Sequence, residues 1–401
     1  MTRRNTLWRL VALLFALAMV AAACGGDDDD STASSGGDDG GSSSTAKEYS
    51  IAFVGPLTGD AANLGIYIRD GAKTAVDEFN KANPDIKITL KEFDTQGDPA
   101  QAPTVLDKYI NDDSIIGIVG PAFSGETKAV LPTLEENNLV MVSASATNVD
   151  LPNVVAGSKS FHRVLPDDKA QAAGVVKYLQ AKLKPSTIAI VHDNSEYGKG
   201  LAVDQVATQL PSSIKVVATE AIDPKSQDFS AAVNKVKAAK PDAVFFGGYY
   251  EAAGRLKKQL TDAGVTAAYI SGDGSLDSGF VKAAGDAANG SYLSCPCYFA
   301  SDASPGKIGE FAKAYAALNG NVPGTYSTEA FDAANILMTG IKEGNTDREA
   351  LRDYVEGLKK VDYAISKDVT FADNGNIEAQ GIFVFVVKDG KIVLDSATDD
   401  L

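Results

Sequence analysis

Histidine and cysteine are scarce in this sequence, whose 401 residues include two histidines and three cysteines. Neither His162 nor His192 is visibly paired with a nucleophile, and the chain has no phosphate-binding GxxxxGK[ST] loop, no GxSxG elbow and no HExxH zinc motif. The sequence therefore argues against an enzyme. We expect a protein that uses neither a metal ion nor a cofactor.

Basic residues are also scarce relative to acidic ones. The sequence has 37 Lys and Arg and 53 Asp and Glu, which gives a formal net charge of −16 at pH 7. Proteins that bind nucleic acids need clustered positive charge, so this balance argues against a nucleic-acid partner. Three of the basic residues lie in the first 23 positions, and six of the acidic residues lie in residues 25–46. The remainder of the chain therefore has 34 basic and 47 acidic residues. An acidic surface of this kind mainly favours solubility.

The N-terminus has the pattern of an export signal. Arg3, Arg4 and Arg9 precede an almost wholly apolar stretch, residues 11–23, which is shorter than a membrane-spanning helix needs. A retained transmembrane helix is the weaker interpretation. The junction Ala-Ala-Ala-Cys resembles a bacterial lipobox, although it lacks the usual Leu, and this resemblance implies cleavage after residue 23 and lipidation of Cys24. The chain is then held at the outer face of the plasma membrane or in the periplasm.

A segment of small and polar residues follows the leader. Residues 24–46 contain Gly, Ser, Thr, Ala and six Asp but no large apolar side chain, so they cannot bury enough surface to fold. We interpret them as a flexible tether, because the aspartates do not have the spacing of a cation site. The remaining chain of roughly 355 residues exceeds what one hydrophobic core usually serves, which predicts two lobes.

Short apolar runs alternate with longer amphipathic ones from residue 49 onward. In the first part we expect strands at 49–54, 86–93, 115–119 and 139–142, and helices at 66–80, 99–111 and 124–136. Short apolar strands separated by helices are typical of a parallel sheet covered on both faces. The predicted fold class is therefore α/β.

The same alternation restarts at residue 170. We expect strands at 187–191, 214–219, 243–246, 268–270 and 291–294, then helices at 307–318, 328–341 and 347–357, and last strands at 369–371, 381–387 and 391–394. A Lys-Asp-Gly turn joins the last two strands. The pattern alone does not distinguish a chain that returns to its first sheet from two independent domains.

Polar loops follow several of these strands, at the edge where open parallel sheets bind ligands. The loops carry hydroxyls in the first part and aromatic rings and carboxylates in the second: Ser124, Ser145, Thr147, Tyr249, Tyr250, Glu251 and Asp273. Hydroxyls and N–H groups at a helix start suit an anion, whereas rings and carboxylates suit a cation. Taken singly, these residues also fit helix N-caps and ordinary turns, so the prediction rests on their joint arrangement.

A series of motifs over residues 48–400 makes the resemblance specific. In order they are IAFVGPLTGDAANLG, EFDTQGDPAQA, IGIVGPAFSGET, VSASATN, IAIVHDNSEYGKGLA, DAVFFGGYYEAAGRLKKQLTDAG and FADNGNIEAQGIFVF. The chain resembles the branched-chain amino-acid-binding family of ABC-transporter periplasmic binding proteins. This resemblance implies the type I fold, with two Rossmann-like lobes joined by a three-strand hinge.

The resemblance also implies roles for individual residues. Ser124 and Thr147 bind the ligand α-carboxylate, while the carbonyl of Ser145, the Asp273 carboxylate and Tyr249 hold its ammonium group. Tyr197 closes over the ligand from the second lobe, and Leu64, Phe123 and Tyr250 line the pocket. Three positions depart from the family: Asp273 replaces a longer Glu, Leu64 replaces an aromatic residue, and Phe123 stands where smaller residues are common.

The implied domain boundaries place residues 47–164 and 298–367 in lobe 1, and residues 165–297 and 368–401 in lobe 2. The three crossings lie near 164–168, 295–299 and 366–371. For Cys295 and Cys297 we favour a disulfide over a metal site, because no further ligands lie nearby in the sequence. Such a bond would stiffen one crossing.

The expected function is a monomeric, lipid-anchored solute-binding protein that delivers a branched-chain-like amino acid to an ABC permease. A binder of an amide, urea or an aromatic acid is the alternative within the binding class. A ligand-sensing ectodomain would have the same lobes, so the sequence does not separate sensing from transport.

Overall fold

The computed structural model describes residues 46–378 and 381–401. Cys24 and the predicted leader and tether lie outside the described residues, apart from residue 46. Within the described part of the chain, no helix combines the length and the apolar character needed to cross a bilayer.

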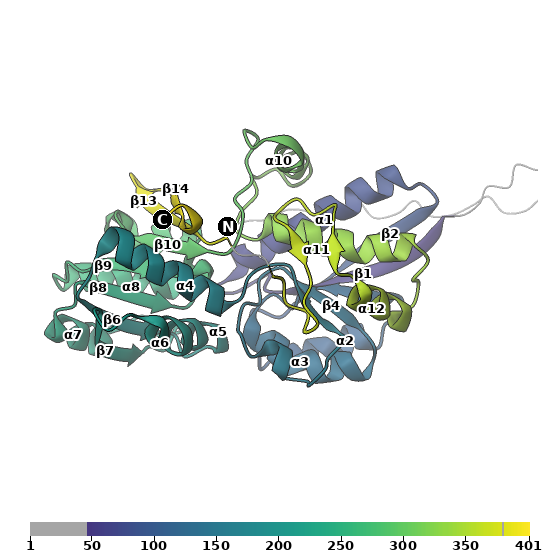
Figure 1. Cartoon of the computed structure of the whole chain (residues 1–401). Helices are drawn as coiled ribbons and strands as arrows, with labels where there is room; N and C mark the ends of the chain where they lie inside the picture. The colour runs from purple at the N-terminus through teal and green to yellow at the C-terminus, as the bar shows by residue number, and fades with distance from the viewer. Residues whose placement is uncertain (1–45, 379–380) are drawn as a thin grey trace, which may run out of the picture. The chain divides into compact units, whose positions relative to one another are not determined.

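A five-stranded parallel sheet forms the first lobe, which we call lobe 1 (Figure 1). Its spatial order is β2-β1-β3-β4-β5. The strands are β1 (Lys47–Gly55), β2 (Ile86–Asp94), β3 (Ile115–Val119), β4 (Val140–Ser143) and β5 (Phe161–Arg163). The central strands read as continuous apolar runs because both of their faces are buried.

Helices cover both faces of this sheet. Alternate residues of β1 take part in different cores: Ile51 and Phe53 belong to the same core as Leu64 and Leu337, whereas Ala52 and Val54 belong to the core of the opposite face. On the first face lie α1 (Ala62–Ala82), α11 (Ser327–Lys342) and α12 (Arg348–Gly357), and on the second lie α2 (Ala102–Ile110) and α3 (Ser124–Glu136). The alternation of side chains along a strand produces these two cores.

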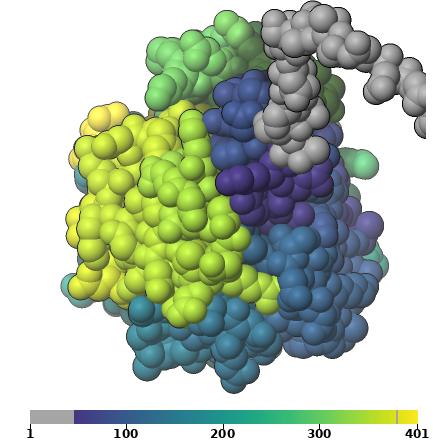
Figure 2. All heavy atoms as spheres, turned by 90° about the vertical axis from the view of Figure 1, so that its right-hand side faces the viewer, coloured from purple at the N-terminus to yellow at the C-terminus, as the bar shows by residue number. Residues whose placement is uncertain are grey.

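Lobe 1 is built from two distant parts of the chain. Helix α11 packs along α1, and α10 (Gly306–Asn319) contacts α1 as well. In the space-filling view of Figure 2, the yellow-green C-terminal part lies directly beside the purple and blue N-terminal part. The chain therefore returns to its first sheet after building the second, a question that the sequence pattern had left open.

A seven-stranded sheet in the order β14-β13-β10-β9-β8-β6-β7 forms the second lobe, lobe 2. Five strands run parallel: β6 (Thr187–His192), β7 (Lys215–Ala221), β8 (Ala243–Gly247), β9 (Ala268–Ser271) and β10 (Tyr292–Cys295). The hairpin β13 (Phe383–Lys388) and β14 (Lys391–Ala397) adds an antiparallel edge. In the predicted Lys-Asp-Gly turn, Asp389 and Gly390 both have positive φ angles, 51° and 70°, as a two-residue hairpin loop requires.

Helices also cover both faces of the second sheet. One core joins the sheet to α7 (Ser230–Ala239), α8 (Tyr250–Asp262) and α9 (Ser278–Ala284). The other core joins it to α4 (Asp168–Tyr178) and to the helical segment that begins with α5 (Glu196–Lys199). The predicted α/β class with two parallel-sheet lobes is confirmed.

The third crossing between the lobes comes later than we predicted. Residues 368–377 were placed in lobe 2, but β12 (Val369–Thr370) pairs with β11 (Lys360–Val361). The Arg163 N–H of β5 donates to Gly375 O at 3.0 Å, and its Nε donates to Asn376 Oδ1 at 2.9 Å. These residues therefore pack on lobe 1, and the chain joins the second sheet only at Phe383.

Candidate ligand-binding site

The loops of lobe 1 place the predicted hydroxyl groups at the start of α3. Ser124 is the first residue of that helix, and its Oγ accepts a hydrogen bond from Asn148 N at 3.2 Å. The Ser145 hydroxyl donates to Ala122 O at 2.5 Å, so this side chain fixes the loop beside the helix start. The buried Thr147 hydroxyl has no hydrogen-bond partner among the described residues. The N–H groups of a first helical turn also lack partners within the helix, which makes this corner suitable for an anion.

Lobe 2 contributes a buried carboxylate. Asp273 follows β9 and is 1% exposed, and its Oδ1 accepts from the Tyr197 hydroxyl at 2.7 Å. The same hydroxyl accepts from Gly274 N at 2.9 Å. Tyr326, which comes from lobe 1 just before α11, donates its hydroxyl to Asp273 Oδ2. Asp273 is thus held by phenol groups from both lobes.

These groups line one small inner cavity of about 10 Å³, with Leu64, Phe123, Ser124, Ser145, Tyr197, Tyr249, Asp273, Gly274 and Tyr326 around it. This volume has room for about one water molecule. Seven of the nine predicted ligand and pocket residues are in this lining. Thr147 precedes Asn148, whose N–H donates to Ser124 Oγ, and is not in the lining.

Tyr250 does not line the cavity. Its ring packs over Gly279, where a Cβ atom would lie 2.5 Å from the ring, and its hydroxyl accepts from Asn63 N at 3.3 Å. Two adjacent tyrosines at the start of a helix point in different directions, so only Tyr249 of the pair reaches the inner cavity.

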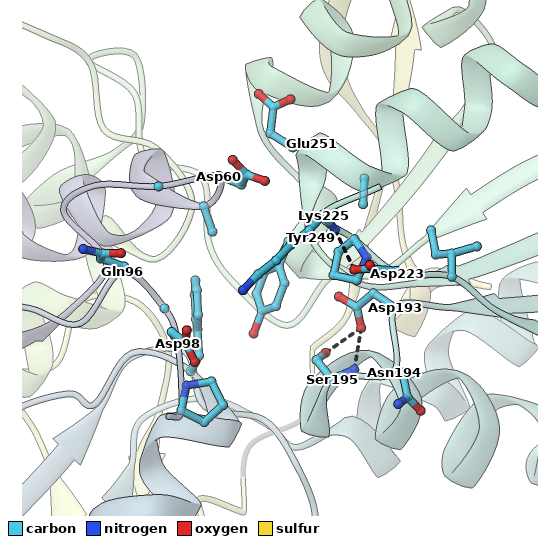
Figure 3. Close-up of a pocket in the computed structure, with 18 of the residues that line it drawn as sticks. Asp60, Gln96, Asp98, Asp193, Asn194, Ser195, Asp223, Lys225, Tyr249 and Glu251 are labelled. Atoms are coloured by element: carbon cyan, nitrogen blue, oxygen red, sulfur yellow. Dashed lines mark hydrogen bonds between the residues drawn. The ribbon is translucent and has the colours of Figure 1, made fainter. Parts of the chain in front are cut away.

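A larger outer cleft of about 890 Å³ lies next to the inner cavity (Figure 3). Asp60, Gln96 and Asp98 of lobe 1 line one side, and Asp193, Lys225 and Glu251 of lobe 2 line the other. Phe123 and Tyr249 line both spaces. Their ring centroids are 4.4 Å apart, and Tyr249 also lies 5.3 Å from Tyr197.

The sequence analysis missed two buried residues of this region, Tyr326 and Asp168. Tyr326 adopts a left-handed backbone, φ 69°, before α11, and the only available signal was a tyrosine preceding a predicted helix. Asp168 begins α4, is fully buried, and has no hydrogen-bond partner on either carboxylate oxygen among the described residues. Nothing in its local sequence distinguishes it from an acidic residue in a first helical turn.

Burial dominates the electrostatics of the site. Burial raises the pKa of Asp273 above its ordinary value, although its phenol partners oppose the shift by stabilising the charged form. Burial raises the pKa of Asp168 well above its usual range, and repulsion from the nearby Asp273 carboxylate raises this pKa further. Burial likewise raises the pKa of Tyr197 and Tyr326, so both phenols stay protonated and can donate. A positive group bound here would favour the ionised carboxylates.

Several contacts join the two lobes directly. Asn63 Nδ2 donates to Asp277 Oδ1 at 2.9 Å, and Asn148 Nδ2 donates to Glu196 O at 2.8 Å. Lys128 Nζ lies 2.6 Å from Glu196 Oε1. Because each of these pairs has one partner in either lobe, the structure is a closed arrangement of the cleft.

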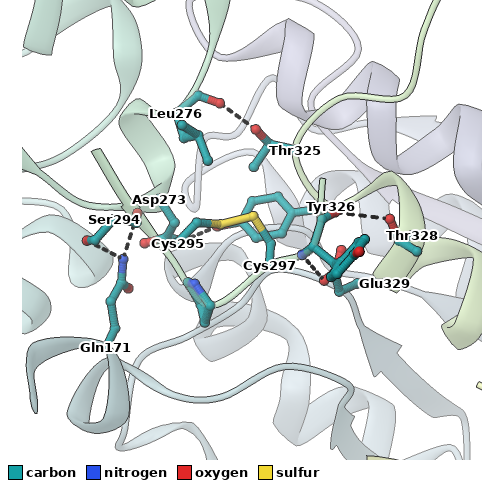
Figure 4. The surroundings of a disulfide bond; sticks show 12 residues. Gln171, Asp273, Leu276, Ser294, Cys295, Cys297, Thr325, Tyr326, Thr328 and Glu329 are labelled. Atoms are coloured by element: carbon teal, nitrogen blue, oxygen red, sulfur yellow. Dashed lines mark hydrogen bonds between the residues drawn. A yellow bond between two sulfur atoms is a disulfide. The ribbon is translucent and has the colours of Figure 1, made fainter. Parts of the chain in front are cut away.

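A disulfide joins Cys295 and Cys297 where the chain leaves β10 for lobe 1, with 5.1 Å between the Cα atoms (Figure 4). Two buried carboxylates of α11 hold neighbouring segments, one on this crossing and one within lobe 1. Glu329 Oε1 accepts from Tyr298 N at 2.8 Å, and Asp332 Oδ2 accepts from Ser366 N at 2.8 Å. Helix α11 thus follows directly on Tyr326 and anchors one of the crossings through Glu329.

No cluster of three or more His, Cys, Asp and Glu side chains suitable for a metal ion occurs within residues 46–378 and 381–401. The chemistry available in the cleft is hydrogen bonding, charge pairing and aromatic contact.

Comparisons with known proteins give one consistent result. A family model described as periplasmic binding protein matches residues 48–391. A Leu/Ile/Val-binding protein of Rhizobium johnstonii is 34% identical over 351 residues, which cover 86% of this chain and 93% of that protein.

Solved structures agree in fold. The branched-chain amino acid transporter substrate-binding protein of Streptococcus pneumoniae, in complex with isoleucine, superimposes with a TM-score of 0.79 at 25% identity, over 88% of this chain and 99% of that one. A solute-binding protein of an ABC transporter from R. palustris, in complex with benzoate, gives a TM-score of 0.76 at 18% identity over 88% of this chain and 96% of that one. The second likeness concerns the fold alone.

Proposed function

The chain belongs to the periplasmic binding protein family, and on that premise we propose that it captures an amino acid, branched-chain in type, and delivers it to an ABC importer. The observation that carries this proposal is the pairing of an anion corner at the start of α3 with the buried carboxylate of Asp273 across the same cavity. A free amino acid carries both complementary charges. A binding role also agrees with the solute-binding relatives of this chain.

In the proposed complex the ligand carboxylate lies against the Ser124 hydroxyl and the first N–H groups of α3. The Thr147 hydroxyl, which is outside the cavity lining, remains a proposed further donor. The ligand ammonium group lies against Asp273, where it competes with the Tyr326 hydroxyl for the carboxylate. Tyr197, which already bonds Asp273 and Gly274 N, keeps that carboxylate oriented. The carbonyl of Ser145 remains a proposed second acceptor for the ammonium group.

Because the two half-sites belong to different lobes, a ligand that bridges them binds the closed arrangement better than the open one. Differential affinity of this kind shifts the population toward closure. We propose the permease as the partner that recognises the closed lobes, and a monomer as the working form.

The buried Asp273 disfavours the alternative ligands. A plain aromatic acid brings no positive group to this carboxylate, and uncharged amides and urea bring only dipoles, so each leaves a buried charge poorly compensated.

The location of the protein is part of the same proposal. We propose an extracytoplasmic protein in which residues 1–23 are removed, Cys24 is lipidated and residues 24–46 act as a tether. A tether of this kind raises the effective concentration of the lobes near the permease. A Cys24→Ala variant that still fractionates with membranes would overturn the anchor while leaving the binding function intact.

A ligand panel tests the proposed function. The purified protein is heated with each amino acid and with urea, simple amides and benzoate, and the melting temperature Tm is recorded. A ligand at 100 times its Kd stabilises the folded protein by about 2.7 kcal/mol, which a thermal-shift assay resolves. A raised Tm with one or a few aliphatic amino acids is expected. A shift with benzoate or an amide and none with any amino acid would overturn the amino-acid assignment.

A further inference from the structure

Two aromatic rings separate the inner cavity from the outer cleft, and they come from different lobes. Phe123 precedes α3 in lobe 1, and Tyr249 precedes α8 in lobe 2. Their centroids lie 4.4 Å apart with an interplanar angle of 33°. Among the described residues, these two alone line both spaces. The ring pair is therefore a partition that forms only when the lobes meet.

The Phe123 ring is held in place from two sides. Its backbone N–H donates to Glu126 Oε2 at 3.0 Å, which fixes the backbone at the helix start. Beneath the ring lies Gly97, where a Cβ atom would come within 2.9 Å of the ring and where φ is +70°. A side chain at position 97 would push the ring out of place, so the glycine lets the ring lie flat against the loop.

Other walls of the inner cavity are buried within the protein. Leu64 is 0% exposed and packs into the core of lobe 1, and Tyr326 is 1% exposed. Behind Phe123 and Tyr249, by contrast, lies the outer cleft of about 890 Å³. A ligand side chain that outgrows the inner cavity can therefore extend in this direction.

We propose that the Phe123–Tyr249 pair sets the upper limit on the length of the ligand side chain, and that the outer cleft is the space a longer side chain would enter. This inference rests on the proposed function, because it assumes that the residues lining the inner cavity hold the amino and carboxylate groups of the ligand. Five carboxylates, those of Asp60, Asp98, Asp193, Asp223 and Glu251, line the outer cleft against one amine, that of Lys225. The space beyond the partition thus suits aromatic and basic side chains better than acidic ones.

The test compares wild type with Phe123→Ala and Phe123→Leu by calorimetric titration with Val, Leu, Phe, Trp, Lys and Glu. We expect wild type to bind the short aliphatic ligands. Phe123→Ala should bind Phe or Trp roughly tenfold or more tightly than wild type does. The affinity of Phe123→Leu for Phe and Trp should lie between those of wild type and Phe123→Ala. In Phe123→Ala the affinity for Lys should increase more than the affinity for Glu. Phe79→Ala, an aromatic truncation on α1 outside both linings, is the matched control and should keep the wild-type ranking.

The outcomes separate the two proposals. An unchanged ranking in Phe123→Ala, with aliphatic binding retained, overturns the partition and leaves the proposed function standing. Failure of wild type to bind any amino acid overturns both. Thermal unfolding of each variant identifies a misfolded one, in which case the milder Phe123→Leu variant decides: unchanged discrimination between Leu and Phe in that variant contradicts the partition.

Discussion

At the scale of single residues, Asp273 carries the recognition of positive charge. Among the residues described around the inner cavity, its side chain is the one with an ionisable carboxyl group. Two phenols donate to it, and neither can neutralise it, because burial raises the pKa of Tyr197 and of Tyr326. A ligand ammonium group would supply the missing counter-charge. Replacement of Asp273 should therefore weaken the binding of ligands that carry an amino group more than the binding of ligands that lack one.

We predict that Asp273→Asn lowers the affinity for the preferred amino acid by roughly 100-fold, since hydrogen bonds between charged groups contribute about 1.5–3 kcal/mol and the ligand charge would be left unpaired. Titration with the amino acid and with its analogue lacking the amino group provides the control. Wild type should discriminate strongly between the two ligands and the variant weakly. Equal discrimination by both proteins would contradict the ammonium role of Asp273.

The sequence could predict site residues that follow strands, because every parallel strand of a sheet ends at the same edge. Ser124, Ser145 and Asp273 were found in this way and lie in one lining. Tyr326 was not found in this way, because its position in the site depends on the return of α11 to lobe 1 late in the chain. The choice between Tyr249 and Tyr250 depends on side-chain direction, which a pattern of residue types does not encode.

At the scale of elements, α3 carries two glutamates in contrasting environments. Glu126 in its first turn is fully buried, and burial raises its pKa to about 7. Glu135 at the other end accepts from the Ser158 hydroxyl at 2.7 Å and from Ser160 N at 2.9 Å, and these bonds lower its pKa although burial opposes them. The same helix thus contains one carboxyl that favours the neutral form and one that favours the charged form.

We predict that Glu126→Gln becomes more stable than wild type as the pH rises. A raised folded pKa contributes stability that is complete below the unfolded value near 4.5 and is lost as the pH rises through about 7. The amide oxygen of Gln can still accept from Phe123 N, and the amide cannot ionise. The Tm difference between variant and wild type should therefore grow by a few °C between pH 5 and pH 8.

Glu135→Gln is the matched control on the same helix. Its lowered folded pKa contributes stability that is present above the unfolded value and lost at lower pH, so this variant should be less stable than wild type at pH 7. A Tm difference between Glu126→Gln and wild type that does not change with pH would contradict the raised pKa of the buried Glu126 carboxyl.

Elements with a strong period were predictable, and two of the shortest strands were not. The main helices and strands appear within a few residues of their expected bounds because their apolar periodicity extends over several residues. Strands β5 and β11, with three and two residues, are too short to show any period and were not expected, whereas β12 was expected at 369–371. The third crossing was misplaced because β11, the unexpected partner of β12, keeps residues 368–377 on lobe 1.

At the scale of the whole molecule, ligand affinity includes the free energy of closing the cleft. The contacts between lobes differ in exposure. Asp277 is 3% exposed where it accepts from Asn63, whereas the side chains of Lys128 and Glu196 are 53% and 36% exposed. A partly buried hydrogen bond to a carboxyl group contributes more than an exposed ion pair, which typically contributes about 0–1 kcal/mol. The two pairs should therefore affect closure unequally.

We predict that Asn63→Ala weakens ligand binding roughly tenfold, mainly through faster release, because the closed form loses a bond that the open form does not make. Lys128→Met removes the exposed pair and should change the affinity by less than about threefold. Neither residue lines the inner cavity, so the ranking of ligands should stay the same in both variants. Stopped-flow measurement of association and dissociation separates the two effects. An affinity unchanged in Asn63→Ala, or a loss confined to the association rate, would mean that this contact does not hold the lobes closed.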